Sequence, residues 1–153
     1  MASAIDVAAY ILEQIGSVTT MKLQELVYYS QARCLVVEDD LLFDNRIEAW
    51  ANGPVVPDLF HAHSGKYMIG RGALDQFASL STLSDSQRAA IDRVIELFRS
   101  YSGERLRALT HNETPWADAR RGYRPGERCE NEITAESMRK YYSSPDCPNP
   151  IAR

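Results

Sequence analysis

The chain has 153 residues, 44% hydrophobic and 25% charged, with a formal net charge of −4, which is typical of one globular domain and argues against general nucleic-acid binding. It has no apolar run near the roughly 20 residues of a membrane span, and no basic N-terminal region precedes an apolar segment, so we expect neither membrane contact nor secretion. Its three cysteines form no Cys-x-x-Cys motif, which favours reduced thiols in a cytoplasm, with a Cys129–Cys147 disulfide as the alternative.

Two helices are predicted near the N-terminus. Ser3, with Asp6 three residues later in place of the usual Glu, predicts a helix N-cap, and Gly16 ends that helix. The second helix begins at Thr19 or Thr20 and ends in a run of three acidic residues, which oppose the helix dipole.

Helical periodicity gives the second helix one apolar face. Adjacent residues on a helix point about 100° apart, so we expect one of Tyr28 and Tyr29 to pack inside and the other to reach an edge or the surface. The predicted face consists of Leu23, Leu26, Val27, Ser30, Cys34 and Val37.

The clearest β signal lies at residues 46–56. A loosely alternating stretch that ends in Trp50 precedes Asn52-Gly53-Pro54, and a short β-branched stretch follows. Gly accepts a positive φ, and Pro moves the residue before it out of the helical region, so a sharp turn is expected here. A short helix is predicted to begin near Pro57.

The second half of the chain is also predicted to be helical. Ser84 and Gln87 form a capping box before the most regular helix, whereas residues 65–83 contain three Gly and show no firm period. We expect shorter helices at residues 104–111, after Pro115 and after Thr134. The predicted fold is mainly α, a compact single domain with a small β element around residues 46–56.

No arrangement of residues predicts catalysis. On a helix, His61 and His63 would point about 200° apart and away from a shared metal, although on a strand they would share a face. Nothing local places His111 and Glu113 beside them, and Cys34 lies on an apolar face, where a thiol is usually inert. We therefore predict no catalytic residue, no metal and no cofactor.

Charge is distributed unevenly along the chain. Residues 1–98 carry 7 basic and 13 acidic residues, a balance of −6, whereas residues 99–128 carry 7 Arg and 4 acids, a balance of +3. This segment is either a partner surface or a solvated segment paired with the acidic half. Its stretch at residues 120–128 also resembles a basic nucleic-acid-binding loop with an interleaved aromatic residue.

Several residues are of the types that anchor protein interfaces. Tryptophan and tyrosine supply large rigid areas, and arginine supplies a forked donor. The alternative is that both tryptophans and at least one tyrosine belong to the core. The candidates are Tyr28, Tyr29, Trp50, Val55, Pro57, Trp116, Arg120, Arg121 and Arg124.

Three blocks, at residues 22–31, 41–60 and 109–120, resemble in content and order the Panacea domain of SocA-like antitoxins and phage-associated bacterial proteins. The resemblance implies a domain at residues 1–142. Residues 143–153 are rich in Pro, so we expect a loosely held tail there. The resemblance also implies a non-enzymatic antitoxin that binds a cognate protein toxin, and we expect the interface candidates named above to contact that toxin.

In the SocA branch, the resemblance further implies an adaptor that delivers the toxin to the ClpXP protease. The alternative is a non-catalytic ligand- or nucleic-acid-binding regulator that uses the Arg-rich loop at residues 120–128. An uncharacterised enzyme is a third reading. A domain of this length has no room for an added DNA-binding domain, so we expect no nucleic-acid partner.

Overall fold

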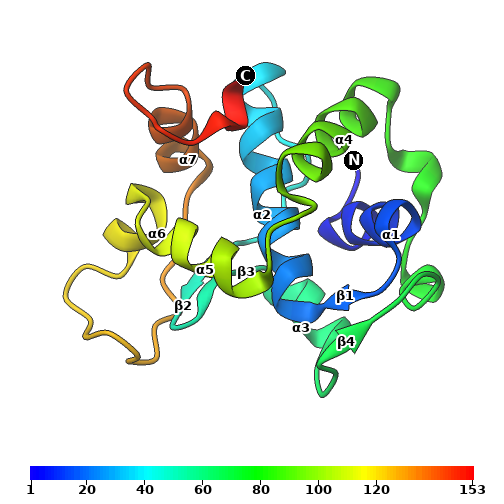
Figure 1. Cartoon of the computed structure of the whole chain (residues 1–153), viewed down its shortest axis with the longest axis horizontal. Coiled ribbons are helices and arrows are strands. Elements are labelled where there is room, and N and C mark those ends of the chain that lie inside the picture. Colours follow the sequence, from blue (N-terminus) through cyan, green and yellow to red (C-terminus); the bar gives the residue numbers. More distant parts are fainter.

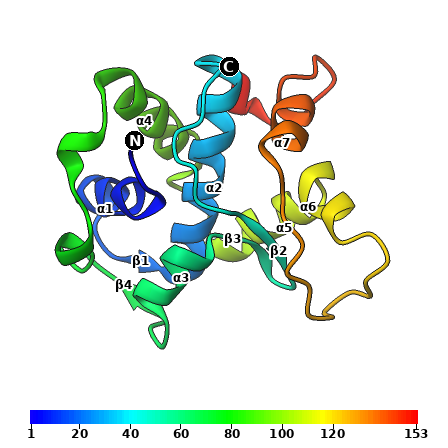
Figure 2. The ribbon, with the colours of Figure 1, turned by 180° about the vertical axis from the view of Figure 1, so that it is seen from behind.

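Helix α2, Thr20–Val37, runs through the middle of the molecule, and the other helices pack around it (Figures 1 and 2). The computed structural model describes residues 1–153. The other helices are α1 Ala4–Ile15, α3 Pro57–His63, α4 Asp85–Phe98, α5 Gly103–His111, α6 Thr114–Ala119 and α7 Ala135–Tyr142. The strands are β1 Val18–Thr19, β2 Glu48–Trp50, β3 Gly53–Val55 and β4 Met68–Ile69. The predicted mainly helical fold with a small β element is confirmed.

Helix α2 is buried on all sides rather than along one face. It contacts α1, α4, α5 and α7, and every residue from 23 to 32 is buried. Its polar side chains therefore need partners inside the protein. The Gln31 Oε1 accepts a hydrogen bond from the Leu42 N–H at 2.8 Å, and its Nε2 donates to the Phe43 carbonyl at 2.7 Å. By contrast Val37, placed on the predicted apolar face, is 45% exposed.

Both tyrosines of α2 lie in the core, so the expectation that one of them reaches the surface is wrong. The Tyr28 hydroxyl lies 3.0 Å from the hydroxyl of Tyr142 on α7, and the Tyr29 hydroxyl donates to Glu113 at 2.7 Å. Helix α7 covers the side of α2 that the sequence pattern leaves open. Each buried hydroxyl thus has a partner within the protein.

Side-chain caps begin the helices where the sequence predicts them. Ser3 and Asp6 form a capping box before α1, and Ser84 and Gln87 form another before α4. Thr19 caps α2 by accepting a hydrogen bond from the third helical N–H at 3.1 Å. Each side chain satisfies a backbone donor that would otherwise lack a partner at the start of a helix.

Strands β2 and β3 form an antiparallel hairpin in which Glu48 pairs with Val55 and Trp50 pairs with Gly53. Pro57 then occupies the first turn of α3, as predicted. Residues 65–83, for which the sequence gives no firm period, contain β4 and two turns of 3-10 helix, Asp75–Phe77 and Leu80–Thr82. Strand β4 pairs with β1 in a second two-stranded sheet.

Three of the last eleven residues, Cys147, Asn149 and Ile151, are buried, contrary to the expectation of a loosely held tail. Ile151 is fully buried, and Asn149 is 4% exposed. Arg33 of α2 donates from Nη1 to the Ile151 carbonyl at 3.0 Å. The C-terminus therefore lies beside the end of α2, as Figure 2 shows. Proline density indicates irregular backbone here, and that backbone is nevertheless held by side chains from other segments.

The cysteines Cys34, Cys129 and Cys147 are free and buried, and the Cys129–Cys147 disulfide does not form in this structure. Burial raises the pKa of the Cys34 thiol to about 11, as the predicted inert thiol requires. None of the helices combines the length and the apolar character that crossing a bilayer requires.

Candidate functional site

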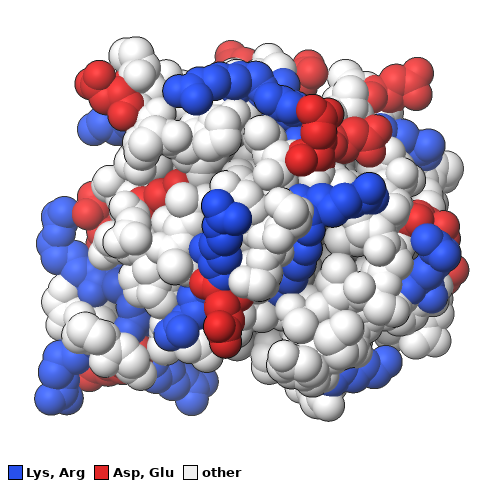
Figure 3. All heavy atoms as spheres, in the orientation of Figure 1, with Lys and Arg blue, Asp and Glu red and all other residues white.

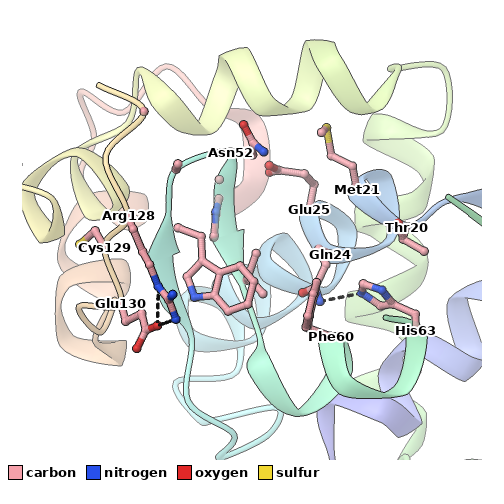
Figure 4. A pocket seen from close by; sticks show the side chains of 16 residues that line it. Thr20, Met21, Gln24, Glu25, Asn52, Phe60, His63, Arg128, Cys129 and Glu130 are labelled. Atoms are coloured by element: carbon pink, nitrogen blue, oxygen red, sulfur yellow. Dashed lines mark hydrogen bonds and ion pairs between the residues drawn. The ribbon is translucent and has the colours of Figure 1, made fainter. Parts of the chain in front are cut away.

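The three sequence blocks meet around the β2–β3 hairpin. From α2, the Gln24 Oε1 accepts a hydrogen bond from the Val56 N–H at 2.9 Å, while its Nε2 contacts the Val56 carbonyl at 3.4 Å. The same Nε2 lies 3.0 Å from the Nε2 of His63 on α3, as the dashed line in Figure 4 shows. One buried amide thus fixes the end of the hairpin and the start of α3 against α2.

Glu25 contacts the turn of the hairpin. Gly53 has a φ of +141°, and a Cβ atom there would lie 2.6 Å from the Glu25 Oε1. Only glycine therefore fits this position without a shift of the carboxyl group or the turn. The Glu25 Oε1 accepts from the Thr110 hydroxyl at 3.3 Å, whereas its Oε2 is buried without a partner.

Helix α6 holds the other side of the hairpin. The Trp116 Nε1 donates to the Trp50 carbonyl at 2.9 Å, and the Arg120 Nη1 donates to the Ala49 carbonyl, also at 2.9 Å. The Trp116 indole stacks on the His111 ring, with centroids 3.8 Å apart and planes 10° apart. These residues position the hairpin, and Trp116 itself is half-buried.

Arg120 is buried, with 5% of its surface exposed. Its Nη2 donates to the carbonyls of Arg124 at 3.2 Å and Glu127 at 2.6 Å, in addition to the bond with β2. Arg120 was predicted as a candidate interface residue of a basic loop, and its guanidinium instead lies inside the protein: it has donors on several sides, and the backbone folds around them. The sequence does not show which backbone carbonyls accept hydrogen bonds from this guanidinium.

The other arginines of the loop lie on the surface. Arg121 pairs with Asp118 at 3.2 Å, Arg124 with Glu127 at 3.8 Å, and Arg128 with Glu130. Their side chains are 79–88% exposed, so these pairs contribute little stability. Figure 3 shows Lys and Arg side chains spread over the face that carries α5 and this loop.

Beside the hairpin lies a pocket of about 600 Å³. The half-buried Trp50 ring meets Phe60 edge to face, with centroids 4.9 Å apart, and Phe60 meets His63 in the same way at 5.5 Å. Figure 4 shows Phe60 and His63, with Glu25 reaching from α2 toward the hairpin. Also in the lining are Met21, Gln24, Pro54, Val55, Arg128 and Glu130.

The pocket brings together only some of the residues predicted from the sequence. Trp50 and Val55 line it, whereas Pro57 is half-buried at the start of α3, outside the lining. Tyr28 and Tyr29 are buried in the core and cannot touch a partner in this conformation. Sequence reasoning missed lining residues on two helices: Met21, Gln24, Glu25, Phe60 and His63. The only available signal was the adjacent polar pair at residues 24–25, next to Leu23 and Leu26 on the predicted apolar face.

A second buried carboxyl group ties the C-terminal residues to the core. Glu113 accepts hydrogen bonds at 2.7 Å from the hydroxyls of Tyr29 and Tyr142 and from the Asn149 amide. Burial raises the pKa of Glu113, an effect that the three donors oppose. All three donors are therefore satisfied around one side chain, which explains how α2, α7 and the chain end meet.

The three histidines differ in burial and in their neighbours. His63 is buried with Gln24, and burial lowers its pKa, whereas His61 on the same helix is exposed. Burial also lowers the pKa of His111, which stacks on Trp116. The structure contains no group of three or more His, Cys, Asp or Glu side chains placed to hold one metal ion.

The comparisons with known proteins agree with this convergence of blocks. The model of the family described as antitoxin SocA-like, Panacea domain, matches residues 23–117, the segment that includes Gln24, the hairpin and Trp116. The matched class is that of antitoxins. The chain belongs to the SocA-like Panacea family. The searches of curated proteins and of solved structures gave no match.

The buried carboxyl of Glu25 predicts a pH dependence of stability. Burial raises its pKa well above the ordinary 4.5, so between these two pKa values the folded chain holds more protons than the unfolded chain. Its contribution to the free energy of unfolding is therefore complete below pH 4.5 and falls above it, by up to about 1.4 kcal/mol per pH unit. Glu25→Gln should remove this contribution.

Urea unfolding of both proteins between about pH 5 and pH 8 checks this prediction. The variant should gain stability relative to the wild type as the pH rises. The exposed Glu96→Gln is the matched control and should follow the wild-type curve. If the free energy of unfolding changed with pH in the same way in the wild type and in Glu25→Gln, Glu25 would have the same pKa in the folded and unfolded chains, which would contradict the prediction.

Proposed function

We propose that this chain is an antitoxin that binds and neutralises a cognate protein toxin and catalyses no reaction itself. Membership of the SocA-like family over residues 23–117 carries the proposal. The arrangement of the site supports it, because the matched blocks use their polar side chains to hold a hairpin rather than to present a catalytic group. Delivery of the toxin to the ClpXP protease is the mechanism we propose, by analogy with the SocA branch named by the family.

We place the toxin contact on one surface, the hairpin–loop face, which consists of Trp50, Val55, Arg121, Arg124 and Arg128. Its aromatic and aliphatic parts belong to the pocket, and its guanidinium groups project from the neighbouring loop. The two parts are joined through the backbone, since the Ala49 N–H donates to the Asn131 carbonyl at 2.8 Å. Trp50 is half-buried and shares the pocket lining with the exposed Arg128, and a tryptophan beside exposed charged groups is typical of an interface centre with a polar rim.

The nucleic-acid reading of the loop has less support. Each exposed arginine of the hairpin–loop face already pairs with an acid two or three residues away, which reduces the charge offered to phosphates. The +3 balance of residues 99–128 in an acidic chain instead suits a partner with an acidic patch.

Co-expression with the neighbouring open reading frame of the native locus tests the proposed function. The neighbour alone should arrest growth, and this chain should restore growth and co-purify with the neighbour. Depletion of ClpX should then raise the amount of neighbour in the cells and abolish rescue if delivery is the mechanism, whereas occlusion would leave rescue intact. A harmless neighbour that does not co-purify would contradict the antitoxin proposal at that locus.

Charge reversal of the loop should slow toxin association. We expect Arg121→Glu, Arg124→Glu and Arg128→Glu together to lower the association rate about tenfold at low salt, because electrostatic steering acts on encounter. Arg120 is left unchanged, since it holds three carbonyls inside the protein. Surface-binding kinetics at two salt concentrations provide the measurement.

The matched control for that experiment reverses three exposed basic residues outside the loop: Arg71, Arg139 and Lys140. This control has the same change in net charge and should keep a rate closer to the wild type. Equal slowing in both triple variants would assign the effect to net charge rather than to the hairpin–loop face.

A further inference from the structure

The pocket wall contains a buried carboxyl oxygen without a hydrogen-bond partner. Glu25 is 1% exposed, and its Oε2 forms no hydrogen bond. A buried carboxyl oxygen without a donor costs free energy, and the carboxyl group cannot relax toward β3, because its other oxygen already lies against Gly53. An unsatisfied group in the wall of a pocket of about 600 Å³ points to a ligand that supplies the missing bond.

The surroundings of that oxygen define the chemistry of the ligand. The walls include the edge-to-face rings of Trp50 and Phe60, which attract cations through their electron-rich faces. Two of the lining residues, Glu25 and Glu130, are acids, and the one basic residue among them, Arg128, already pairs with Glu130. Burial lowers the pKa of His63, which disfavours a positive charge on its ring.

We propose that this pocket receives a cationic side chain, a lysine or arginine of the toxin, whose head group donates to the Glu25 Oε2 while its stem packs against the rings of Trp50 and Phe60. The inference rests on the proposed function and names the chemistry of the partner at the same site. A neutral apolar side chain would fill the pocket and leave the buried oxygen without a donor. A cationic side chain satisfies the oxygen and the aromatic walls together.

Binding of a cation requires Glu25 to lose its proton. Burial raises the pKa of Glu25, and the ionisable groups around it are Glu113, which favours the neutral form, and Arg107 of α5, which favours the charged form. Tyr28 and Tyr29 of α2 face it as neutral groups with raised pKa. The hairpin presents Gly53, which does not titrate. The carboxyl proton passes to the buffer as the cation enters, so uptake of a cationic probe releases protons.

Small probes test the pocket without the toxin. Butylguanidinium and butylammonium are titrated into the full chain, with 1-butanol as the neutral probe of similar shape, and the Trp50 indole N–H is followed by NMR. We expect each cation to bind at least about fivefold more tightly than 1-butanol. Calorimetry in two buffers of different ionisation enthalpy should show proton release for the cations alone. Equal affinities, or no perturbation of Trp50, would overturn the inference.

Variants then connect the probe result to the toxin. Glu25→Gln keeps the shape of the side chain and should bring the ratio of the affinity for a cationic probe to the affinity for 1-butanol close to one. Phe60→Leu should weaken the binding of both classes of probe. The exposed Glu132→Gln is the matched control and should leave the preference unchanged. Folded Glu25→Gln protein should also capture less toxin in the co-expression assay. Undiminished capture and rescue by this variant would overturn the inference while leaving the antitoxin proposal in place.

Discussion

Replacing Arg120 by methionine is expected to lower the free energy of unfolding by about 3–5 kcal/mol. Its guanidinium donates to the carbonyls of Ala49, Arg124 and Glu127, and it lies 5.2 Å from the centre of the Trp116 ring. Hydrogen bonds from charged donors are worth about 1.5–3 kcal/mol each. Methionine retains much of the packing but supplies no donor. The expected loss is smaller than the sum of three hydrogen bonds because water can reach the two partly buried loop carbonyls more readily than the buried carbonyl in β2.

Chemical denaturation measures this effect, and Arg121→Met is the matched control. Arg121 is 79% exposed and forms one surface ion pair, so the control should change stability by less than about 0.5 kcal/mol. A fully stable Arg120→Met protein would show that the loop and β2 hold their conformations without this residue. That result would contradict the claim that the hydrogen bonds of the buried Arg120 hold the loop against β2.

Gly53→Ala is expected to destabilise the chain and to displace Glu25. Its φ of +141° is strained for any residue with a Cβ atom, and that atom would meet the Glu25 Oε1 at 2.6 Å. Strain of this kind costs about 1–3 kcal/mol, and overpacking adds a similar amount. The melting temperature should fall accordingly, and the pH dependence of stability should change because the carboxyl group moves.

Gly126→Ala is the matched control for that substitution. Gly126 also has a positive φ, +81°, but an added Cβ would have no neighbour within 4 Å. The control therefore carries backbone strain without the clash and should lose only about 1 kcal/mol. Equal losses at the two positions would mean that the contact between Gly53 and Glu25 contributes nothing.

Local signals in the sequence predicted much of the fold. The Ser3 and Ser84 capping boxes, the hairpin turn at Gly53 and the helix that begins at Pro57 all lie where expected. Each depends on the conformational preference of a few neighbouring residues, which a sequence displays directly. Burial of both tyrosines of α2 depends on α7, more than a hundred residues away, and periodicity does not report such coverage.

The candidate site was less accessible from the sequence. Trp50 was identified by residue type and lies at the pocket, whereas Arg120, of an equally suitable type, is structural. The difference arises because the loop carbonyls turn inward and satisfy the guanidinium, a choice of partner that spacing does not encode. Glu25 was missed because the one acidic residue of α2 is distinguished only by its contact with Gly53, which lies against it in the fold.

The expected loose tail failed for a related reason. Its proline content correctly indicated irregular backbone, but Asn149 reaches Glu113, and Arg33 reaches the last carbonyls. Irregular backbone is held when side chains elsewhere supply donors and acceptors. These contacts join residues more than thirty positions apart. Composition alone therefore predicted that the C-terminal backbone is irregular, but not that it is held against the core.

Hydrogen exchange of the chain, alone and with the co-purified toxin, tests the central claim most directly. The account predicts that the toxin slows exchange in residues 48–55 and 120–130, which carry the hairpin–loop face, and leaves α1 and the β1–β4 sheet unchanged. Protection confined to α1 or β4, with the hairpin and loop exchanging as in the free chain, would place the toxin elsewhere and contradict the account.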